Sequence, residues 1–279
     1  MDHADCFVWD LDPILLDLGP LQLRYYGIIF ASMLYIGFLL WRWQMLRGGH
    51  KEALANKFLL WGVIAVMAGA RLGHCLFYEP ARYLADPVSI LYFWKGGLSS
   101  HGATAGLAVA LVWFARRYRL SVLEVMDRFA MSAAVGAAAV RLGNFFNSEV
   151  VGRATDAAWA VCFPVYDCHA LKMCPAAVPR HPSQLYEFTM GLAVLGALWL
   201  SDRLAGRERR PLGLLAGLFL ALYFSGRFMV EFVKEYQAAH LNAADSVLTM
   251  GQYLSLLPLA AGLALVAWSL TKRRRGGQE

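Results

Sequence analysis

Apolar residues occur along this chain in about seven long runs, separated by short polar or basic stretches. Each run is close to the roughly 20 mostly apolar residues that an α-helix needs to cross the hydrocarbon core of a bilayer. The pattern therefore predicts an all-α integral membrane protein, with little of the chain left for a separate soluble domain. The predicted spans are residues 25–43, 58–78, 97–115, 122–145, 185–204, 212–232 and 247–270.

Basic residues divide the turns between the predicted spans into two kinds. Turns rich in Lys and Arg stay on the cytoplasmic side of a membrane. Here they alternate with turns that lack such clusters, which predicts an N-terminus outside and a C-terminus inside. The basic clusters lie at residues 42–57, 116–119, 203–210 and 272–275. The predicted outer segments are the acidic N-terminus and the loops at 79–96, 146–184 and 233–246.

The composition agrees with a membrane protein. Hydrophobic residues make up 58% of the chain and charged residues only 16%, whereas soluble domains carry about 25% charged residues. The net charge of +6 comes from the clusters beside the apolar runs, without a basic face of the kind that binds nucleic acid. We therefore predict no nucleic-acid partner, and the acidic start predicts no cleaved signal peptide.

The chain is predicted to form one polytopic membrane domain over residues 1–279, with the loop at 146–184 as a small external subdomain. Cys162, Cys168 and Cys174 lie in this loop at spacings that match no zinc-binding pattern. In an oxidising compartment two of them would form a disulfide. Free or simply packed thiols fit the sequence equally well.

Three arginines lie inside predicted spans that run outward from the cytoplasmic side. Arg71, Arg141 and Arg227 each stand roughly 13 to 20 residues from the cytoplasmic start, or about 20 to 30 Å at 1.5 Å per residue. Charged groups at such depth usually face a protein interior or a watery cavity, and a guanidinium fork suits phosphate oxygens. The spacing predicts an anion site in the outer half of the membrane. Interfacial snorkelling or a structural ion pair is the alternative.

Other polar side chains are predicted to gather at the same level. Glu231 follows Arg227 by one helical turn, and Tyr26 and His101 begin spans that start outside. Histidine is the side chain best suited to accept a proton near neutral pH. A histidine near a helix start more often serves only as a hydrogen-bonding residue.

Polar groups are also concentrated where the fourth predicted span leaves the membrane, at Arg141, Asn144, Glu149 and Gly152. A helix-ending turn would account for the glycine, but not for the three polar side chains together. Residues 180–187 open the next span from outside. We predict that they line the same cavity, with simple helix capping as the alternative.

Motifs for metal or nucleotide chemistry are absent from the sequence, so no metal site and no cofactor are predicted. Two other classes of protein remain open. A lipid or anion transporter would also place arginines in a cavity, but it needs polar residues in the inner half of the spans, where few occur. An intramembrane hydrolase would use Ser99 or Ser100 beside His101.

These residues together resemble the bacterial prolipoprotein diacylglyceryl transferase family over nearly the whole chain. The chain departs from the family's usual glycine at Ala103, Val140 and Ser148, without losing a charged or proton-transferring position. The matching motifs are Asp12-Pro13 with Gly19-Pro20, Arg24-Tyr25-Tyr26-Gly27, Ala70-Arg71-Leu72-Gly73, residues 96–102, the signature 141–152, His181-Pro182-Ser183-Gln184-Leu185-Tyr186-Glu187, Arg227 to Glu231, and Met250-Gly251-Gln252.

The resemblance implies a transferase of the bacterial cytoplasmic (inner) membrane, with its active site toward the periplasm. The family moves the diacylglyceryl group of phosphatidylglycerol to the thiol of the lipobox Cys in a prolipoprotein signal peptide, the first step of lipoprotein maturation. Glycerol phosphate is released and a thioether forms. The partners expected from this resemblance are phosphatidylglycerol, prolipoprotein signal peptides and membrane lipid.

The matching motifs also carry expected roles onto this chain. His101 would take the thiol proton, and Arg141 and Arg227 would bind the phosphate and its developing charge. Tyr26 is a further catalytic candidate. The other residues expected around the substrate are Asn144, Glu149, Gly152, Glu231 and, for the lipid headgroup, Arg71.

Overall fold

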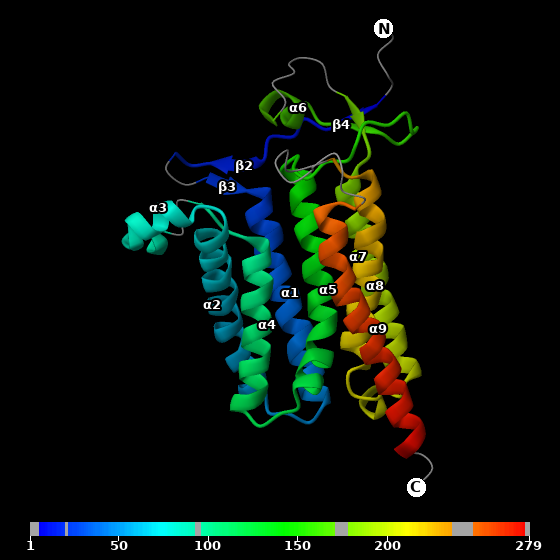
Figure 1. Cartoon of the computed structure of the whole chain (residues 1–279). Coiled ribbons are helices and arrows are strands. Elements are labelled where there is room, and N and C mark those ends of the chain that lie inside the picture. Colours follow the sequence, from blue (N-terminus) through cyan, green and yellow to red (C-terminus); the bar gives the residue numbers. More distant parts are fainter. Residues whose placement is uncertain (1–5, 20–21, 93–95, 171–177, 236–247, 277–279) are drawn as a thin grey trace. The chain divides into compact units, whose positions relative to one another are not determined.

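A computed structural model describes residues 6–19, 22–92, 96–170, 178–235 and 248–276. In this part of the chain seven long helices dominate the fold, and each overlaps one predicted span (Figure 1). The prediction of a mainly helical chain is confirmed. The long helices are α1 (Tyr25–Arg47), α2 (Glu52–Phe77), α4 (Ser100–Arg117), α5 (Val122–Phe146), α7 (Ser183–Leu204), α8 (Leu214–Val230) and α9 (Met250–Gly276).

Among the described residues, five helices are long and apolar enough to cross a membrane, namely α1, α2, α5, α8 and α9. The chain is therefore a multi-pass membrane protein by the length and composition of its helices. α4 and α7 fall outside this group because polar residues occupy their ends. α4 begins with Ser100 and His101 and ends with two arginines, and α7 carries Gln184 and Glu187 in its first turns.

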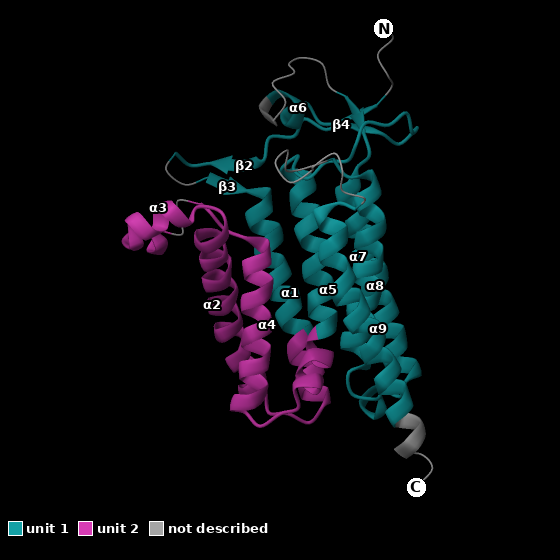
Figure 2. Ribbon diagram, in the orientation of Figure 1, with its two compact units in different colours: residues 1–40, 130–279 teal, residues 41–129 magenta. Residues whose placement is uncertain are grey.

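The chain divides into two compact units (Figure 2). One consists of residues 1–40 and 130–279, and the other of residues 41–129. The boundaries fall inside α1 and α5, so each of these helices contributes one part to each unit.

In the unit 41–129, α2 and α4 pack with their backbones close together. A Cβ atom on Gly73 would lie 2.7 Å from the Cα of Gly102, and one on Gly69 would lie 2.9 Å from the Cα of Gly106. Small residues allow this close approach between helices in membranes. The glycines therefore fix the distance between α2 and α4 at the end where α4 begins.

Aromatic rings fill this unit toward the other end of α2 and α4. The ring centroid of Phe58 lies 4.7 Å from that of Trp41 and 5.2 Å from that of Phe114. The Trp41 indole is buried and donates a hydrogen bond to the carbonyl of Ala55 over 3.0 Å. Beyond α2 the chain forms two short helices that sequence patterning did not predict, α3 (Pro80–Ala85) and η1 (Pro87–Leu91).

In the unit formed by residues 1–40 and 130–279, α5, α7 and α8 share an apolar core. Met131, Leu198 and Leu215 are completely or almost completely buried in it. α9 packs on α8 through a second close approach, because a Cβ atom on Gly217 would lie 3.1 Å from the carbonyl oxygen of Gly262. Two short helices follow α7 and α8, η3 (Arg207–Arg209) and η4 (Glu231–Val233).

The same unit carries a small sheet built from distant parts of the sequence. Its strand order is β1-β4-β5, with β1 (Phe7–Val8) parallel to β4 (Val161–Cys162) and β4 antiparallel to β5 (Pro179–Arg180). The helix α6 (Pro164–Ala170) follows β4, and a hairpin of β2 (Ile14–Asp17) and β3 (Gln22–Arg24) leads into α1. We call the described part of residues 6–9 and 151–182 the head.

A disulfide joins Cys6 to Cys162 in the head. The sequence left open a disulfide between two of the three loop cysteines. Cys162 instead pairs with the N-terminal cysteine, which the pairing of β1 with β4 brings beside it. Cys168 is also disulfide-bonded. Cys174 lies outside the described residues.

Candidate active site

A chain of ion pairs joins three helical segments at one end of the unit that contains α5, α7 and α8. The Arg141 guanidinium of α5 contacts the Glu187 carboxylate of α7. The other oxygen of Glu187 lies 3.1 Å from Lys234 Nζ, and Lys234 Nζ lies 3.3 Å from Glu231. The Glu187 side chain is only 1% exposed. Two predicted site residues, Arg141 and Glu231, are thus brought together through Glu187 and Lys234.

Arg227 belongs to the same group of charges but, unlike Arg141 and Lys234, it forms no ion pair in the described part of the chain. It stands one turn before Glu231 near the end of α8, and its charge acts on Glu187. Within the described part of the chain its side chain makes no ion pair or hydrogen bond. We call Arg141, Glu187, Arg227, Glu231 and Lys234 the charged cluster.

The charged cluster contains three cations and two carboxylates, so one positive charge is in excess. An uncompensated charge away from bulk water is costly. A bound anion would lower that cost, and a guanidinium without a protein partner is the natural ligand for phosphate oxygens. The cluster can therefore hold a phosphate. Arg227 is the cation of the cluster whose side chain has no ion pair among the described residues.

Lys234 was not singled out by the sequence, because its place depends on the pairing of two distant loops. The backbone of Gly152 pairs with that of Lys234 in an antiparallel bridge, and the N–H of Arg153 donates to the carbonyl of Val233 over 2.8 Å. A Cβ atom on Gly152 would lie 2.6 Å from the Cβ of His181. Gly152 is therefore needed to let these segments meet, and the ligand role predicted for it stays a prediction.

Backbone and side-chain hydrogen bonds hold the turn that follows α5 in an unusual shape. Ser148 and Val150 have φ angles of +52° and +59°, which side chains rarely adopt. Ser183 donates to the carbonyl of Val150 over 2.9 Å, and Gln184 donates to that of Glu149 over 2.8 Å. Residues 183 and 184 thus brace this turn, and the positive φ of Ser148 is a conformation that glycine adopts with less strain.

The carboxyl of Glu149 lies at this turn, outside the membrane-spanning helices. It accepts a hydrogen bond from the Asn147 amide over 3.3 Å. Partial desolvation raises the pKa of Glu149 above its usual range, while the Asn147 hydrogen bond and the Arg24 charge act in the opposite direction. The backbone of Asn144 accepts the N–H of Glu149 over 2.9 Å, so these two predicted site residues are neighbours.

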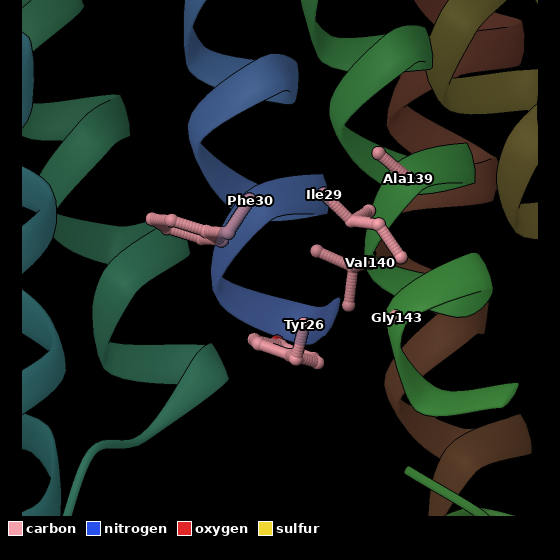
Figure 3. A pocket seen from close by; sticks show the side chains of 6 residues that line it. All are labelled: Tyr26, Ile29, Phe30, Ala139, Val140 and Gly143. Carbon is pink, nitrogen blue, oxygen red and sulfur yellow. The ribbon is translucent and has the colours of Figure 1, made fainter. Parts of the chain in front are cut away.

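Tyr26 lies against α5, as Figure 3 shows, where its ring fills the space left by Gly143. The ring atoms would lie 2.7 Å from a Cβ at that position. Tyr26 is also close enough to Glu149 and Arg141 to interact with their charges. The crevice around it has no room for a water molecule, and its lining residues are Tyr26, Ile29, Phe30, Ala139, Val140 and Gly143.

The structure at the start of α9 explains why the motif Met250-Gly251-Gln252 contains a glutamine and a glycine. The amide oxygen of Gln252 accepts the N–H of Thr249 over 2.9 Å, and the Thr249 hydroxyl accepts the N–H of Gln252 over 3.2 Å. This reciprocal pair is a capping box. A side chain on Gly251 would collide with the Glu231 carboxylate. The motif therefore starts the helix and leaves room for the charged cluster.

Arg71 and His101 belong to the unit 41–129. Arg71 is buried and donates to the carbonyls of Ser89, Ile90, Gly96 and Gly97 over 2.6 to 3.1 Å. Its guanidinium is thus largely used in holding the chain that precedes α4. These contacts favour a structural role for Arg71, and its headgroup role stays a prediction.

His101 is exposed in the first turn of α4. Ser99 caps this helix, because its hydroxyl accepts the N–H of Gly102 over 3.3 Å and its own N–H donates to the carbonyl of Ala70. Ser99 is thereby engaged as a cap, which does not favour the hydrolase alternative. Within the described residues, no group of three or more His, Cys, Asp or Glu side chains is arranged to hold a metal ion.

The fold and the charged cluster define a class: a multi-pass helical membrane protein with a buried, net cationic site near one end of its helices. A family model described as prolipoprotein diacylglyceryl transferase matches residues 13–268. The chain belongs to this family, and it is a transferase.

Relatives of similar length support this assignment. A phosphatidylglycerol–prolipoprotein diacylglyceryl transferase of Nitrosomonas europaea is 40% identical over 262 residues, covering 92% of this chain and 90% of the relative. Proteins of the same name are 38% identical in Chloroherpeton thalassium, covering 97% of each chain, and 37% identical in Cupriavidus pinatubonensis, covering 96% of this chain and 95% of the relative.

Proposed function

We propose that this chain transfers the diacylglyceryl group of phosphatidylglycerol to the lipobox cysteine of prolipoproteins. The names of its relatives supply the two substrates. The observation on this chain that carries the proposal is the excess positive charge of the charged cluster, with Arg227 free of ion pairs in the described structure. A phospholipid headgroup is the natural anion for such a site in a membrane.

The reaction is a displacement at a carbon of the lipid glycerol. The thiolate sulfur forms a C–S bond to this carbon, and the C–O bond to the phosphate breaks with its electron pair left on the phosphate oxygen. Arg141 and Arg227 bind the phosphate and stabilise the charge that develops on it. Glycerol phosphate leaves, and the thiol proton passes to a base, for which His101 is our candidate.

The remaining residues act by positioning these groups. Glu187 holds Arg141 through their contact, and Lys234 keeps Glu187 from neutralising Arg141 completely. Tyr26, Asn144, Glu149, Gly152 and Glu231 are proposed to shape the space around the headgroup.

We propose seven membrane spans in the bacterial inner membrane, with the N-terminus and the head in the periplasm. The disulfide between Cys6 and Cys162 supports this orientation, because disulfides persist in oxidising compartments such as the periplasm. The backbone of Gly152, in the external subdomain proposed at 146–184, pairs with that of Lys234 of the charged cluster. The signal peptide would present its cysteine at this end of the helices.

The experiment is an assay of the full chain in detergent with phosphatidylglycerol and a signal peptide that bears the lipobox cysteine. We expect the peptide to gain a diacylglyceryl mass while glycerol phosphate appears. Arg227→Ala should lower turnover by about 10²- to 10³-fold, the usual loss when one charge-stabilising donor is removed. Arg203→Ala is the matched control, since Arg203 is exposed and stacks on Trp199 away from the charged cluster.

Three outcomes separate the parts of the proposal. No mass gain with folded wild-type protein would refute the transferase reaction itself. A normal rate in Arg227→Ala would refute its phosphate role, and near-normal turnover in His101→Gln would refute the assignment of His101 as base.

A further inference from the structure

α4 presents an uncovered apolar face that ends in two arginines. Its residues form two parallel rows at the i, i+4, i+8 spacing, and each row ends in an arginine. The rows line a groove of about 710 Å³. Val109 is 69% exposed and Trp113 is 41% exposed. The rows are Ala108, Val112 and Arg116, and Val109, Trp113 and Arg117.

Part of this face remains exposed although α4 packs along α2 in the same unit, so in a membrane it meets lipid. α4 packs along α2, a helix apolar enough to cross a membrane, through their facing glycines. Near the arginine end the ring of Trp113 lies 5.2 Å from that of Trp61, and tryptophan is enriched at the interface between lipid and water. The apolar rows then lie at the depth of the acyl chains, and the arginines at the depth of the headgroups.

The two arginines are available to a ligand. Within the described residues neither Arg116 nor Arg117 forms an ion pair. The guanidinium of Arg117 lies over the ring of Tyr118 at 5.6 Å, a contact that leaves its N–H donors unused. Both arginines line the same groove, and guanidinium groups suit the oxygens of a phosphate.

We infer that this groove binds an anionic phospholipid at a site of its own, beyond the proposed transfer reaction. One acyl chain lies between the two rows, which extend for about 12 Å from Ala108 to Arg116 at 1.5 Å per residue. The lipid phosphate is held by Arg116 and Arg117. The site stands at the end of α4 opposite to His101 and therefore serves the other leaflet.

The test is native mass spectrometry of the full chain after removal of bound lipid, followed by titration with phosphatidylglycerol or with phosphatidylcholine of the same acyl chains. The variant Arg116→Gln/Arg117→Gln removes the headgroup contacts, and Ala108→Phe fills the groove without changing charge. Arg207→Gln/Arg209→Gln is the matched control, because these arginines are exposed and do not line the groove. Thermal unfolding shows whether each variant is folded.

We expect both groove variants to lose one bound phosphatidylglycerol, with at least tenfold weaker binding, while the control binds as the wild type does. Equal binding of phosphatidylcholine would overturn the requirement for an anion. A similar loss in the control would mean that only general surface charge attracts lipid, and unchanged binding in Ala108→Phe would exclude the groove. Loss of a dimer signal in place of a lipid would assign the face to a second copy of the chain.

Discussion

Replacement of Glu187 by glutamine tests the central contact of the charged cluster. The Glu187 side chain is 1% exposed and lies between Arg141 and Lys234. The variant keeps the shape of the side chain but leaves two buried cations without their shared carboxylate. Removing one partner of a buried ion pair typically costs about 3 to 5 kcal/mol. For a chain of this size, 1 kcal/mol shifts the unfolding temperature by about 2 to 4 °C, so we expect a fall of about 6 °C or more.

The assay is thermal unfolding in detergent, paired with the turnover measurement. Glu52→Gln is the control, because its ion pair with Arg42 is exposed and such pairs contribute about 1 kcal/mol or less. A second variant, Glu187→Gln/Lys234→Met, restores the charge balance and should recover part of the lost stability. If Glu187→Gln melts within 1 or 2 °C of the wild type, Glu187 does not hold the cluster together. The same conclusion follows if the loss of stability in the double variant equals the summed losses of Glu187→Gln and Lys234→Met.

Four further changes have expected outcomes. Gly102→Ala should force α2 and α4 apart and lower the unfolding free energy by about 1 to 3 kcal/mol; Gly196→Ala, with open space around it, should not, and equal melting temperatures would contradict the packing argument. Ser148→Gly should raise stability by about 1 kcal/mol, because it relieves the positive φ; an unchanged or lower melting temperature would speak against strain there. Cys6→Ser should cost about 2 to 5 kcal/mol in non-reducing buffer, and the same melting temperature as the wild type would show that the disulfide adds nothing. Because the pKa of Glu149 is raised, the folded state holds this proton longer, and stability should decline as pH rises from about 4.3 through the raised pKa. Glu149→Gln should remove this decline in melts recorded from pH 4 to 7, and an identical pH profile would refute the assignment.

Hydropathy was enough to locate the helices. Each predicted span overlaps a long helix, because an apolar run of about 20 residues has few other ways to satisfy its backbone in a membrane. The short elements α3, η1 and α6 were missed, since they lie in loops without a long apolar period. Their shapes depend on contacts with other parts of the chain, which periodicity does not report.

Side-chain roles were only partly predictable. Arg71 and Arg141 stand at similar places in their helices, and the sequence predicted an anion-binding role for both. The structure separates them, because Arg71 donates to backbone carbonyls whereas Arg141 contacts a carboxylate. Lys234 was missed because it reaches Glu187 only after its backbone pairs with Gly152. A sequence shows which charges are deep, but their partners are decided by tertiary contacts.

The link between Cys6 and Cys162 also sets an order of events during synthesis. The two cysteines are 156 residues apart, and a ribosome adds about 5 to 20 residues per second. Cys6 therefore remains a free thiol for about 8 to 30 s while α1, α2, α4 and α5 are being made. During that time β1 has no strand to pair with, so the sheet of the head forms only after more than half of the chain has been made.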